Sequence, residues 1–380
     1  MSSTTYLKPT APVDIGLVTS SKLPGRASVS VIIPCYNEER FIGKALANLA
    51  GQYPTEEYEI IVVDGMSEDD TRQVVLEFQQ SHTDVSIKLL DNPARNIPHA
   101  LNLGIAAARG EVIARMDAHA VPSPGYIKRC VEVLTHGEKC GRTAIVGMPC
   151  RVRPAEKTIT ARAIAIGVSH PFGIGDARYR LDGEVKGSAG LETQQEVDTV
   201  AFASFRKSLW SELGGFDEQL LTNEDYDFNY RARAGGHRVV LDRLAHCDYF
   251  ARATLPKLAS QYLRYGTWKA RMIRSRPRSV KWRHLVAPAF VASIVAFAAI
   301  GLWQSIAWRM LVLEIATYLV ASVAFGYQAA RKSRENFLVI LMMPLVFLTI
   351  HFSWGTSFLR GLASTPSVLR GSHPGPQDRG

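Results

Sequence analysis

Carboxylates and a histidine occur in this sequence at a spacing that suits cation binding. The segment 117–119 (DAH) places Asp117 and His119 two positions apart, and so on the same side of an extended strand. A carboxylate and an imidazole form part of a shell for Mg²⁺ or Mn²⁺ and leave positions for the phosphate oxygens of a substrate. Taken alone, the pattern is equally typical of a strand-terminal Asp that caps the next turn.

A second acidic cluster lies at 223–227 (NEDYD), just before a predicted helical run at 228–234. Glu224 and Asp225 fall at or near the helix N-terminus, where the helix dipole keeps carboxylates ionised. An ionised carboxylate held by backbone N–H groups is suited to act as a general base. Solvated acids that only cap the helix would give the same pattern. Two glycines at 214–215 predict a sharp turn that directs this segment towards the site.

A third motif, at 261–265 (QYLRY), lies within the most basic part of the chain. At helical spacing, Gln261, Arg264 and Tyr265 share one face with Trp268. Such a face suits a membrane interface, with aromatic rings at headgroup level and basic side chains on phosphates. It is equally suited to covering an active site.

The elements that position these motifs alternate between strand and helix. Predicted strands at 28–34, 58–63, 85–90 and 112–116 alternate with predicted helices at 41–49, 71–80 and 98–109. This order predicts right-handed βαβ units and a parallel sheet. Ligands of such sheets bind beyond the carboxyl ends of the strands. No glycine-rich dinucleotide-binding motif or P-loop follows the first strand, which argues against a dinucleotide or P-loop nucleotide site.

Charge is distributed unevenly along the 380 residues, whose net charge is +9. Residues 1–251 carry 27 basic and 32 acidic side chains, whereas residues 252–283 carry ten basic and no acidic ones. This basic segment runs directly into the apolar region that follows, and the sequence contains no DNA-reading motif. Both observations argue against a nucleic-acid partner. The five scattered cysteines indicate neither a disulfide framework nor a zinc site.

The C-terminal third contains three apolar stretches, Leu285–Trp303, Leu311–Ala330 and Asn336–Leu359. A helix needs about 20 apolar residues to cross the hydrocarbon core of a bilayer, so three membrane spans are predicted. Basic residues lie before the first stretch and between the second and third, and the positive-inside rule places both on the cytoplasmic side. The C-terminal tail lies outside if the third stretch crosses the membrane, and inside if that stretch re-enters or lies at the interface.

In this order and spacing, the motifs resemble the family 2 inverting glycosyltransferases with a GT-A fold. Four segments carry the resemblance: SVIIPCYNEE, IIVVDGMSEDDT, NIPHALNLGIAAARGEVIARMDAH and GGFDEQLLTNEDYDFNYRARAGG. Within that family the sequence is most similar to bacterial exopolysaccharide enzymes of the succinoglycan-biosynthesis type. The features shared with those enzymes are VDGMS, DAH in place of D-x-D, NEDY, and QYLRYG before membrane spans.

The resemblance implies an α/β fold, with a mostly parallel twisted sheet, flanking helices and a C-terminal helical transmembrane region. The expected organisation is a polar leader at 1–27, a GT-A catalytic domain at 28–250, a basic amphipathic interface segment at 251–283, a transmembrane region of about three helices at 284–360 and a flexible tail at 361–380.

Carried over residue by residue, the resemblance makes Asp225 the base that deprotonates the acceptor, with Glu224 beside it. It implies that Asp64 contacts the uracil ring, and that Asp117 and His119 bind Mg²⁺ or Mn²⁺. The residues expected to bind the nucleotide sugar are Pro34, Tyr36, Glu38, Asp64, Asn96, Asp117, Gln261 and Arg264.

The activity implied is transfer of a hexose, glucose by resemblance, from a UDP-sugar to a lipid-linked (polyprenyl diphosphate) saccharide. The product would enter exopolysaccharide or cell-surface glycan synthesis. The enzyme would be a multi-pass protein of the inner (plasma) membrane with a cytoplasmic catalytic domain. A catalytically silent sugar- or lipid-binding membrane protein of the same fold is the alternative, and His119 in place of an acid favours it.

Overall fold

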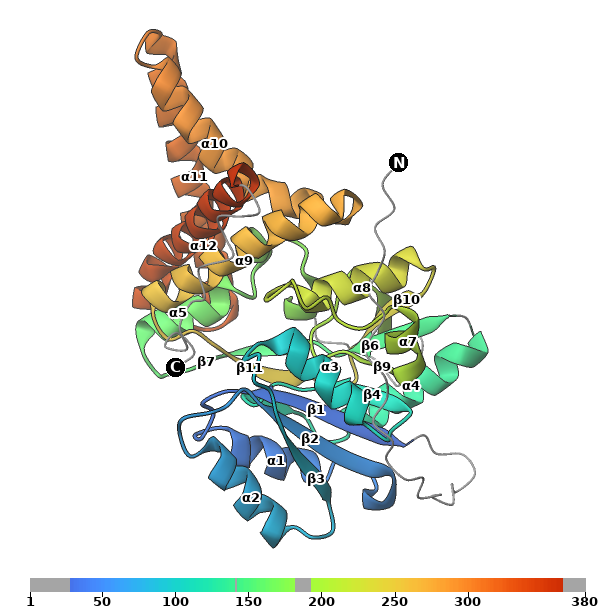
Figure 1. Ribbon diagram of the computed structural model, residues 1–380. Helices are drawn as coiled ribbons and strands as arrows, with labels where there is room; N and C mark the ends of the chain where they lie inside the picture. The colour runs from blue at the N-terminus through green and yellow to red at the C-terminus, as the bar shows by residue number, and fades with distance from the viewer. Residues whose placement is uncertain (1–27, 141, 182–192, 365–380) are drawn as a thin grey trace, which may run out of the picture.

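The structure is a computed structural model that describes residues 28–140, 142–181 and 193–364. The predicted leader and most of the predicted tail lie outside these residues. Figure 1 shows a twisted sheet flanked by helices, from which C-terminal helices project. The predicted strands and helices of the first 116 residues agree with the structure to within two residues at each end.

The main sheet has eight strands in the order β3-β2-β1-β4-β9-β6-β10-β8. The strands are β1 (Val29–Cys35), β2 (Tyr58–Asp64), β3 (Ser86–Asp91), β4 (Val112–Arg115), β6 (Thr143–Gly147), β8 (Gln194–Glu196), β9 (Ser204–Arg206) and β10 (Arg238–Asp242). β1 pairs in parallel with β2 and β4, while β9 is antiparallel to both of its neighbours and β8 is antiparallel to β10. The prediction of a mostly parallel sheet is confirmed.

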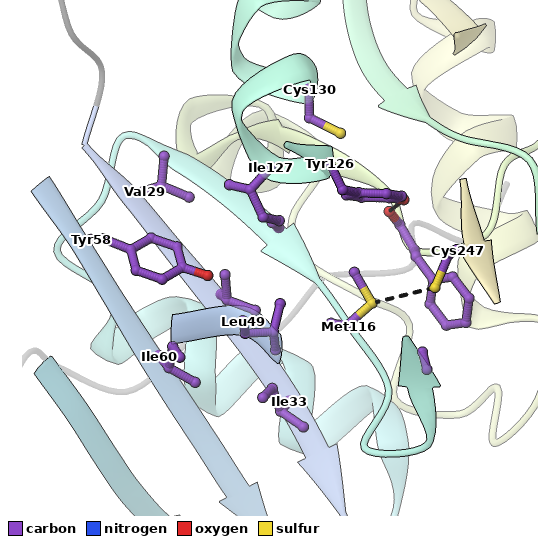
Figure 2. Close-up of a cluster of buried hydrophobic side chains, with 14 of the residues drawn as sticks. Val29, Ile33, Leu49, Tyr58, Ile60, Met116, Tyr126, Ile127, Cys130 and Cys247 are labelled. Carbon is purple, nitrogen blue, oxygen red and sulfur yellow. Dashed lines mark hydrogen bonds between the residues drawn. The ribbon is translucent and has the colours of Figure 1, made fainter. Parts of the chain in front are cut away.

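Helices cover both faces of this sheet, because successive residues of its buried strands point to opposite sides. The helices are α1 (Ile42–Ala50), α2 (Thr71–Ser81), α3 (Ile97–Ala107), α4 (Tyr126–Cys140), α7 (Lys207–Glu212) and α8 (Glu224–Ala234). Val31 and Ile33 of β1 pack with α1, α2 and α4, whereas Ile32 packs with α3, α7 and α8. Figure 2 shows part of the first cluster, where the phenol of Tyr126 donates to the carbonyl oxygen of Phe202 at 3.1 Å.

A second, three-stranded sheet connects this unit to the C-terminal helices. It contains β5 (Ala120–Pro122), β11 (Cys247–Ala251) and β7 (Cys150–Pro154), in that order. Two helices follow β7, α5 (Ile159–Gly167) and the short α6 (Pro171–Ile174), while α9 (Leu255–Ser275) follows β11. The second sheet therefore places α9 on the cavity that lies beyond the carboxyl end of β4, with α5 packed against β7, β11 and α9.

Within the described residues, three helices are long and apolar enough to cross a membrane. They are α10 (Trp282–Ile300), α11 (Ser305–Lys332) and α12 (Phe337–Ala363). Figure 1 shows α10 and α11 as a hairpin that points away from the sheet. The hairpin exposes large apolar side chains, such as Trp303 (79%) and Val320 (70%).

α12 packs differently, because it also lies against α5 and α9 (Figure 1). Two glycines permit this close approach. A Cβ at Gly266 would lie 2.6 Å from the carbonyl oxygen of Trp354, and a Cβ at Gly167 would lie 2.5 Å from Val346. α12 is thus attached to elements that precede the hairpin, and the side of the membrane on which the chain ends stays a prediction.

Candidate active site

A cavity of about 1150 Å³ lies where the carboxyl ends of β1 and β4 meet α8, α9 and the base of the hairpin. It brings together side chains that lie far apart in the sequence. The predicted site residues that line it are Pro34, Tyr36, Glu38, Asp117, His119, Glu224, Asp225, Gln261 and Arg264. Of this set, Pro34, Tyr36, Glu38, Asp117 and His119 lie at or just beyond the ends of β1 and β4, whereas the other four come from α8 and α9.

Glu38, which follows β1, and His119, which follows β4, face each other across this cavity. Nδ1 of His119 lies 3.2 Å from Oε1 of Glu38. Burial lowers the pKa of His119, but the hydrogen bond with Glu38 and the charge of Asp117 raise it, so that the pKa lies above its usual value. Because Glu38 engages Nδ1, Nε2 is the ring nitrogen left for a metal, as is usual for metal-binding histidines.

The donor set at Asp117 and His119 fits a divalent cation that a substrate helps to hold. The described residues contain no group of three or more His, Cys, Asp or Glu side chains that could bind a metal ion by themselves. Asp117 and His119 supply one carboxylate and one imidazole to the cavity. Mg²⁺ and Mn²⁺ with so few protein ligands complete their shells with phosphate oxygens and water.

Arg115 joins the two acidic motifs. Its Nη1 lies 3.0 Å from Oε1 of Glu224, and its Nε lies 3.4 Å from Oδ1 of Asp117. Burial raises the pKa of Glu224 to about 7, although the guanidinium of Arg115 acts in the opposite direction. Arg115 is absent from the residues predicted above. A signal for it exists, because it precedes Asp117 by two positions and so shares its side of the strand.

Asp225 has access to the cavity, whereas Glu224 is only 4% exposed. The helical run predicted from residue 228 in fact begins at Glu224, because Asn223 in the left-handed region (φ 68°) turns the chain into the helix. Acidic residues in the first turn then interact favourably with the helix dipole. One oxygen of Asp225 accepts from the backbone N–H of Tyr226 at 2.7 Å.

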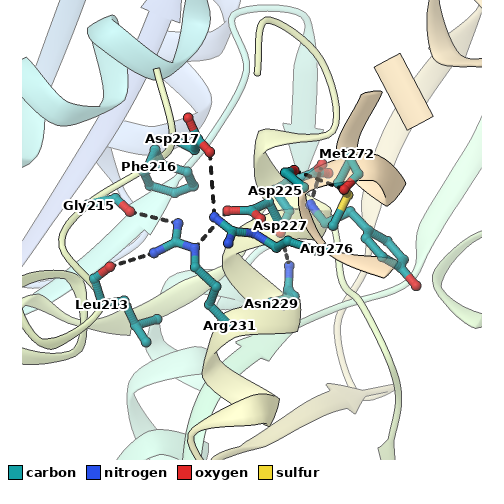
Figure 3. Close-up of polar contacts among 12 residues, drawn as sticks. Leu213, Gly215, Phe216, Asp217, Asp225, Asp227, Asn229, Arg231, Met272 and Arg276 are labelled. Atoms are coloured by element: carbon teal, nitrogen blue, oxygen red, sulfur yellow. Dashed lines mark hydrogen bonds and ion pairs between the residues drawn. The ribbon is translucent and has the colours of Figure 1, made fainter. Parts of the chain in front are cut away.

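The third carboxylate of the cluster, Asp227, has a structural role (Figure 3). Its side chain is fully buried between Arg231, at 2.7 Å, and Arg276 of the basic segment. Arg231 also donates to the carbonyl oxygen of Gly215 at 2.7 Å. Gly214 (φ 72°) and Gly215 (φ 81°) form the predicted turn. These contacts fix the turn and the basic segment to the first half of α8.

The start of α9 covers the cavity. Nε2 of Gln261 donates to the hydroxyls of Tyr249 at 3.2 Å and Tyr265 at 3.1 Å. Arg180 lies beside them, with its guanidinium carbon 5.4 Å from the centre of the Tyr249 ring. Gln261, Arg264 and Tyr265 thus line the cavity, as the covering role requires, and contact with a membrane interface stays the other prediction for this motif. Arg180 was not predicted, because no local pattern connects it to Gln261.

Asp64 and Asn96 do not line the cavity. The side chain of Asp64 has no exposed surface, and its oxygens bind Ser67 (2.5 Å to the hydroxyl) and Arg72 (2.8 Å). Asn96 caps α3 by accepting from the backbone N–H of His99 at 3.1 Å. It lines a separate recess of about 20 Å³ beside Pro34 and Tyr36. Contact of Asp64 with a uracil ring stays a prediction, and it would require this carboxylate to exchange one of its partners.

A comparison with known families identifies the chain. The family described as Glycosyl transferase family 2 matches residues 30–243, which is more than half of the chain. The chain belongs to glycosyl transferase family 2. The cavity described above lies largely within the matched region, so it is the candidate active site of a glycosyltransferase.

Two relatives of this family 2 glycosyltransferase match nearly its whole length. A dolichyl N-acetyl-α-D-glucosaminyl phosphate 3-β-D-2,3-diacetamido-2,3-dideoxy-β-D-glucuronosyltransferase of Methanococcus voltae is 26% identical over 90% of this chain and 99% of its own. The succinoglycan biosynthesis protein ExoA of Rhizobium meliloti is 25% identical over 91% of this chain and 98% of its own.

Among solved structures, the mannosyltransferase PcManGT of Pyrobaculum calidifontis, in complex with GDP-Man and Mn²⁺, resembles this chain with a TM-score of 0.59. It is 21% identical, and the match covers 87% of this chain and 88% of that one. The likeness confirms the predicted GT-A fold.

Proposed function

We propose that this protein is a metal-dependent, inverting glycosyltransferase that transfers a hexose from a UDP-sugar to a lipid-linked saccharide. The shape and lining of the cavity support this most directly. Besides the polar groups at the sheet edge, the cavity is lined by apolar and aromatic side chains of the hairpin and α12. Those side chains include Trp282, Val286, Phe290, Ile350 and Trp354. One continuous cavity thus offers surfaces for a charged donor and for a hydrophobic acceptor.

The relatives support the same acceptor class. The Methanococcus voltae enzyme is named for a dolichyl-phosphate-linked sugar, and the Rhizobium meliloti protein for succinoglycan synthesis. Both match the C-terminal helices of this chain as well as its catalytic unit, because the matches cover nine-tenths of it. The choice of UDP-glucose as donor rests on the sequence resemblance alone, and we propose it on that ground.

In the proposed reaction, Asp225 accepts the proton of the acceptor hydroxyl as its oxygen attacks the anomeric carbon. Attack from the face opposite the diphosphate inverts the configuration. Arg115 and Glu224 keep the start of α8 in place, so that the carboxylate of Asp225 is positioned before the substrate arrives. A divalent cation bound by Asp117 and His119 would supply the charge that stabilises the departing nucleoside diphosphate.

For the location, we propose an inner-membrane protein with its catalytic unit in the cytoplasm, where sugar nucleotides are made. The α10–α11 hairpin would span the bilayer, and the basic segment 251–283 would face the cytoplasmic headgroups. Not every basic side chain of that segment is available for lipid. Arg276 is paired with Asp227, whereas Arg278 is exposed. Membrane contact would therefore fall to the exposed members.

A donor panel on membranes containing the protein tests this proposal. UDP-glucose, UDP-galactose, UDP-N-acetylglucosamine and GDP-mannose are supplied with a lipid extract, with and without Mn²⁺, and nucleotide release is measured. We expect release of UDP from UDP-glucose that depends on both Mn²⁺ and lipid. Release of GDP alone would contradict the donor assignment. Release from none of the four donors would favour the catalytically silent alternative.

A further inference from the structure

Lys269 of α9 has a buried amine that lines the cavity and has no oxygen partner among the described residues. The residue is only 2% exposed. Its Nζ lies 3.2 Å from the centre of the Tyr226 ring and 3.7 Å from Sδ of Met272. Within the described part of the chain, no carboxylate or carbonyl oxygen forms a hydrogen bond or ion pair with it. A buried ammonium in such surroundings is unfavourable unless a ligand supplies the missing acceptor.

Of the carboxylates that act on Lys269, Asp198 and Asp227 are paired with arginines, whereas the charge of Asp225, the proposed base, acts on it most strongly. Arg283 lies 2.6 Å from Asp176 and 2.5 Å from Asp198. Arg276 is paired with Asp227. Burial lowers the pKa of Lys269 to about 7, and the nearby carboxylates only partly oppose that shift. An anion bound next to the amine would restore its charge.

The position of Lys269 along the cavity indicates which anion fits. The Tyr226 ring under its Nζ follows Asp225, the proposed base, in the chain. That ring also contacts the ring of His284 on α10, with 5.5 Å between centroids. His284 is followed on α10 by Val286 and Phe290, apolar side chains that also line the cavity. Chain order and contacts therefore connect the proposed base to the amine of Lys269 and then to apolar surface.

A sugar linked through phosphate to a lipid has its parts in the same order. We infer that Lys269 binds the phosphate of the lipid-linked acceptor, with the sugar towards Asp225 and the lipid chain along α10. This subsite rests on the proposed function, because it assumes that the acceptor is a lipid phosphate. It also assigns a role to a residue that no motif in the sequence singles out.

Matched probes test the subsite without knowledge of the acceptor sugar. The full-length protein in nanodiscs is titrated with farnesyl phosphate, farnesol or inorganic phosphate, and binding is followed by the fluorescence of the tryptophans in the cavity wall. We expect farnesyl phosphate to bind about 10- to 100-fold more tightly than farnesol, as a hydrogen bond to a charged group predicts. Lys269→Met should remove this difference, and Lys269→Arg should retain part of it. Lys128→Met, which changes an exposed lysine on α4, should retain all of it.

Each outcome decides the assignment. Equal preference for farnesyl phosphate in the wild type and in Lys269→Met would overturn it. Inorganic phosphate that binds as tightly as farnesyl phosphate would show a free-phosphate site instead. If Lys269→Met does not fold, the ratio of the affinities for farnesyl phosphate and farnesol is compared between the wild type and Lys269→Arg instead. If the wild type releases UDP but binds farnesyl phosphate and farnesol equally, only the phosphate subsite is contradicted, and the proposed function stands. Discrimination without nucleotide release from any donor would instead retain the subsite and contradict the proposed function.

Discussion

The catalytic unit and the α10–α11 hairpin are both rich in apolar side chains, but they use them differently. In the sheet, Ile32 and Val62 are completely buried between helices. In the hairpin, Val312 is 65% exposed and Leu302 is 72% exposed. Exposed apolar surface on this scale marks contact with a partner or a membrane. The catalytic unit buries its apolar side chains within itself, whereas those of the hairpin stay exposed. We propose that lipid covers them.

The two walls of the cavity also differ, in whether their charged side chains find partners within the protein. On the sheet side, Arg115 and Glu224 form an ion pair, and Glu38 is paired with His119. On the helical side, Lys269 lies over an aromatic ring, and the residues that the structure describes give it no oxygen acceptor. The sheet side is therefore preorganised by its own contacts, whereas the helical side is completed by a ligand. Five measurements test this difference.

The largest effect is expected from Asp225→Asn, which removes the proposed base from the preorganised wall. Loss of a general base typically costs about 10²- to 10⁴-fold in rate. Acceptor-dependent UDP release should fall by that factor, while binding of the UDP-sugar, measured by calorimetry, should persist. Asp84→Asn, at an exposed position, serves as the matched control. Full turnover by Asp225→Asn would exclude this residue as the base.

Arg115→Met should destabilise the same wall, because it leaves Glu224 buried without its partner. Breaking a buried ion pair from one side costs about 3–5 kcal/mol. The free energy of unfolding, measured by denaturant titration, should fall by that amount. Arg95→Met provides the comparison, because Arg95 and Glu68 are both largely exposed and such pairs contribute less than about 1 kcal/mol. Equal losses would mean that the buried pair does not hold α8.

Glu38→Gln should weaken the cation site without removing a ligand. A carboxylate that orients a metal-binding histidine typically contributes about 10- to 100-fold to metal affinity. The Mn²⁺ concentration for half-maximal UDP release should rise by that factor. Glu77→Gln, on α2 outside the cavity, should leave it unchanged. An unchanged Mn²⁺ requirement in Glu38→Gln would assign Glu38 to the nucleotide rather than to His119.

The buried charge on the helical wall predicts a pH-dependent stability. Because burial lowers the pKa of Lys269 from 10.5 to about 7, the unfolded chain binds more protons than the folded one between those values. The stability of the wild type should therefore rise with pH across that interval. Lys269→Met should melt a few degrees above the wild type at about pH 6, with the gap narrowing towards about pH 9. A difference in melting temperature that stays constant with pH would show that burial does not lower the pKa of Lys269.

The smallest effect is expected at the exposed part of the basic segment. Arg278→Gln removes one charge that faces outward, and each such charge contributes about 1 kcal/mol to binding of anionic membranes. Acceptor turnover in vesicles with anionic lipid should fall a few-fold, whereas turnover in neutral vesicles should not change. Donor binding serves as the internal control. Equal turnover in both kinds of vesicle would remove the proposed headgroup contact.

Much of the fold could be predicted because its signals are local. The β-branched strands and the polar turns after them indicated a parallel sheet, and the apolar stretches indicated three long helices. At the site, NEDY indicated an acidic helix start, and Asp225 lies there. Arg115 could also have been predicted, since strand alternation places it on the same side of the strand as Asp117.

Other parts depended on contacts between distant segments. The sequence placed Asp64 at a strand end with other ligand-binding residues, but Ser67 and Arg72 surround its carboxylate. Nothing in the local sequence distinguishes Arg180 or Lys269 from the many other basic residues of the chain. Their surroundings come from β11, α8 and α9, which fold together only in the tertiary structure.

The sequence by itself determined the sheet, the apolar helices and the acidic start of α8, because periodicity, turn residues and helix dipoles act over a few neighbouring residues. Only the tertiary structure decided that α9 lines the cavity, that α12 lies against α5 and that Lys269 has no oxygen partner in the described part of the chain. Burial and pairing of charges depend on which distant segments meet, and that is fixed by packing rather than by local pattern.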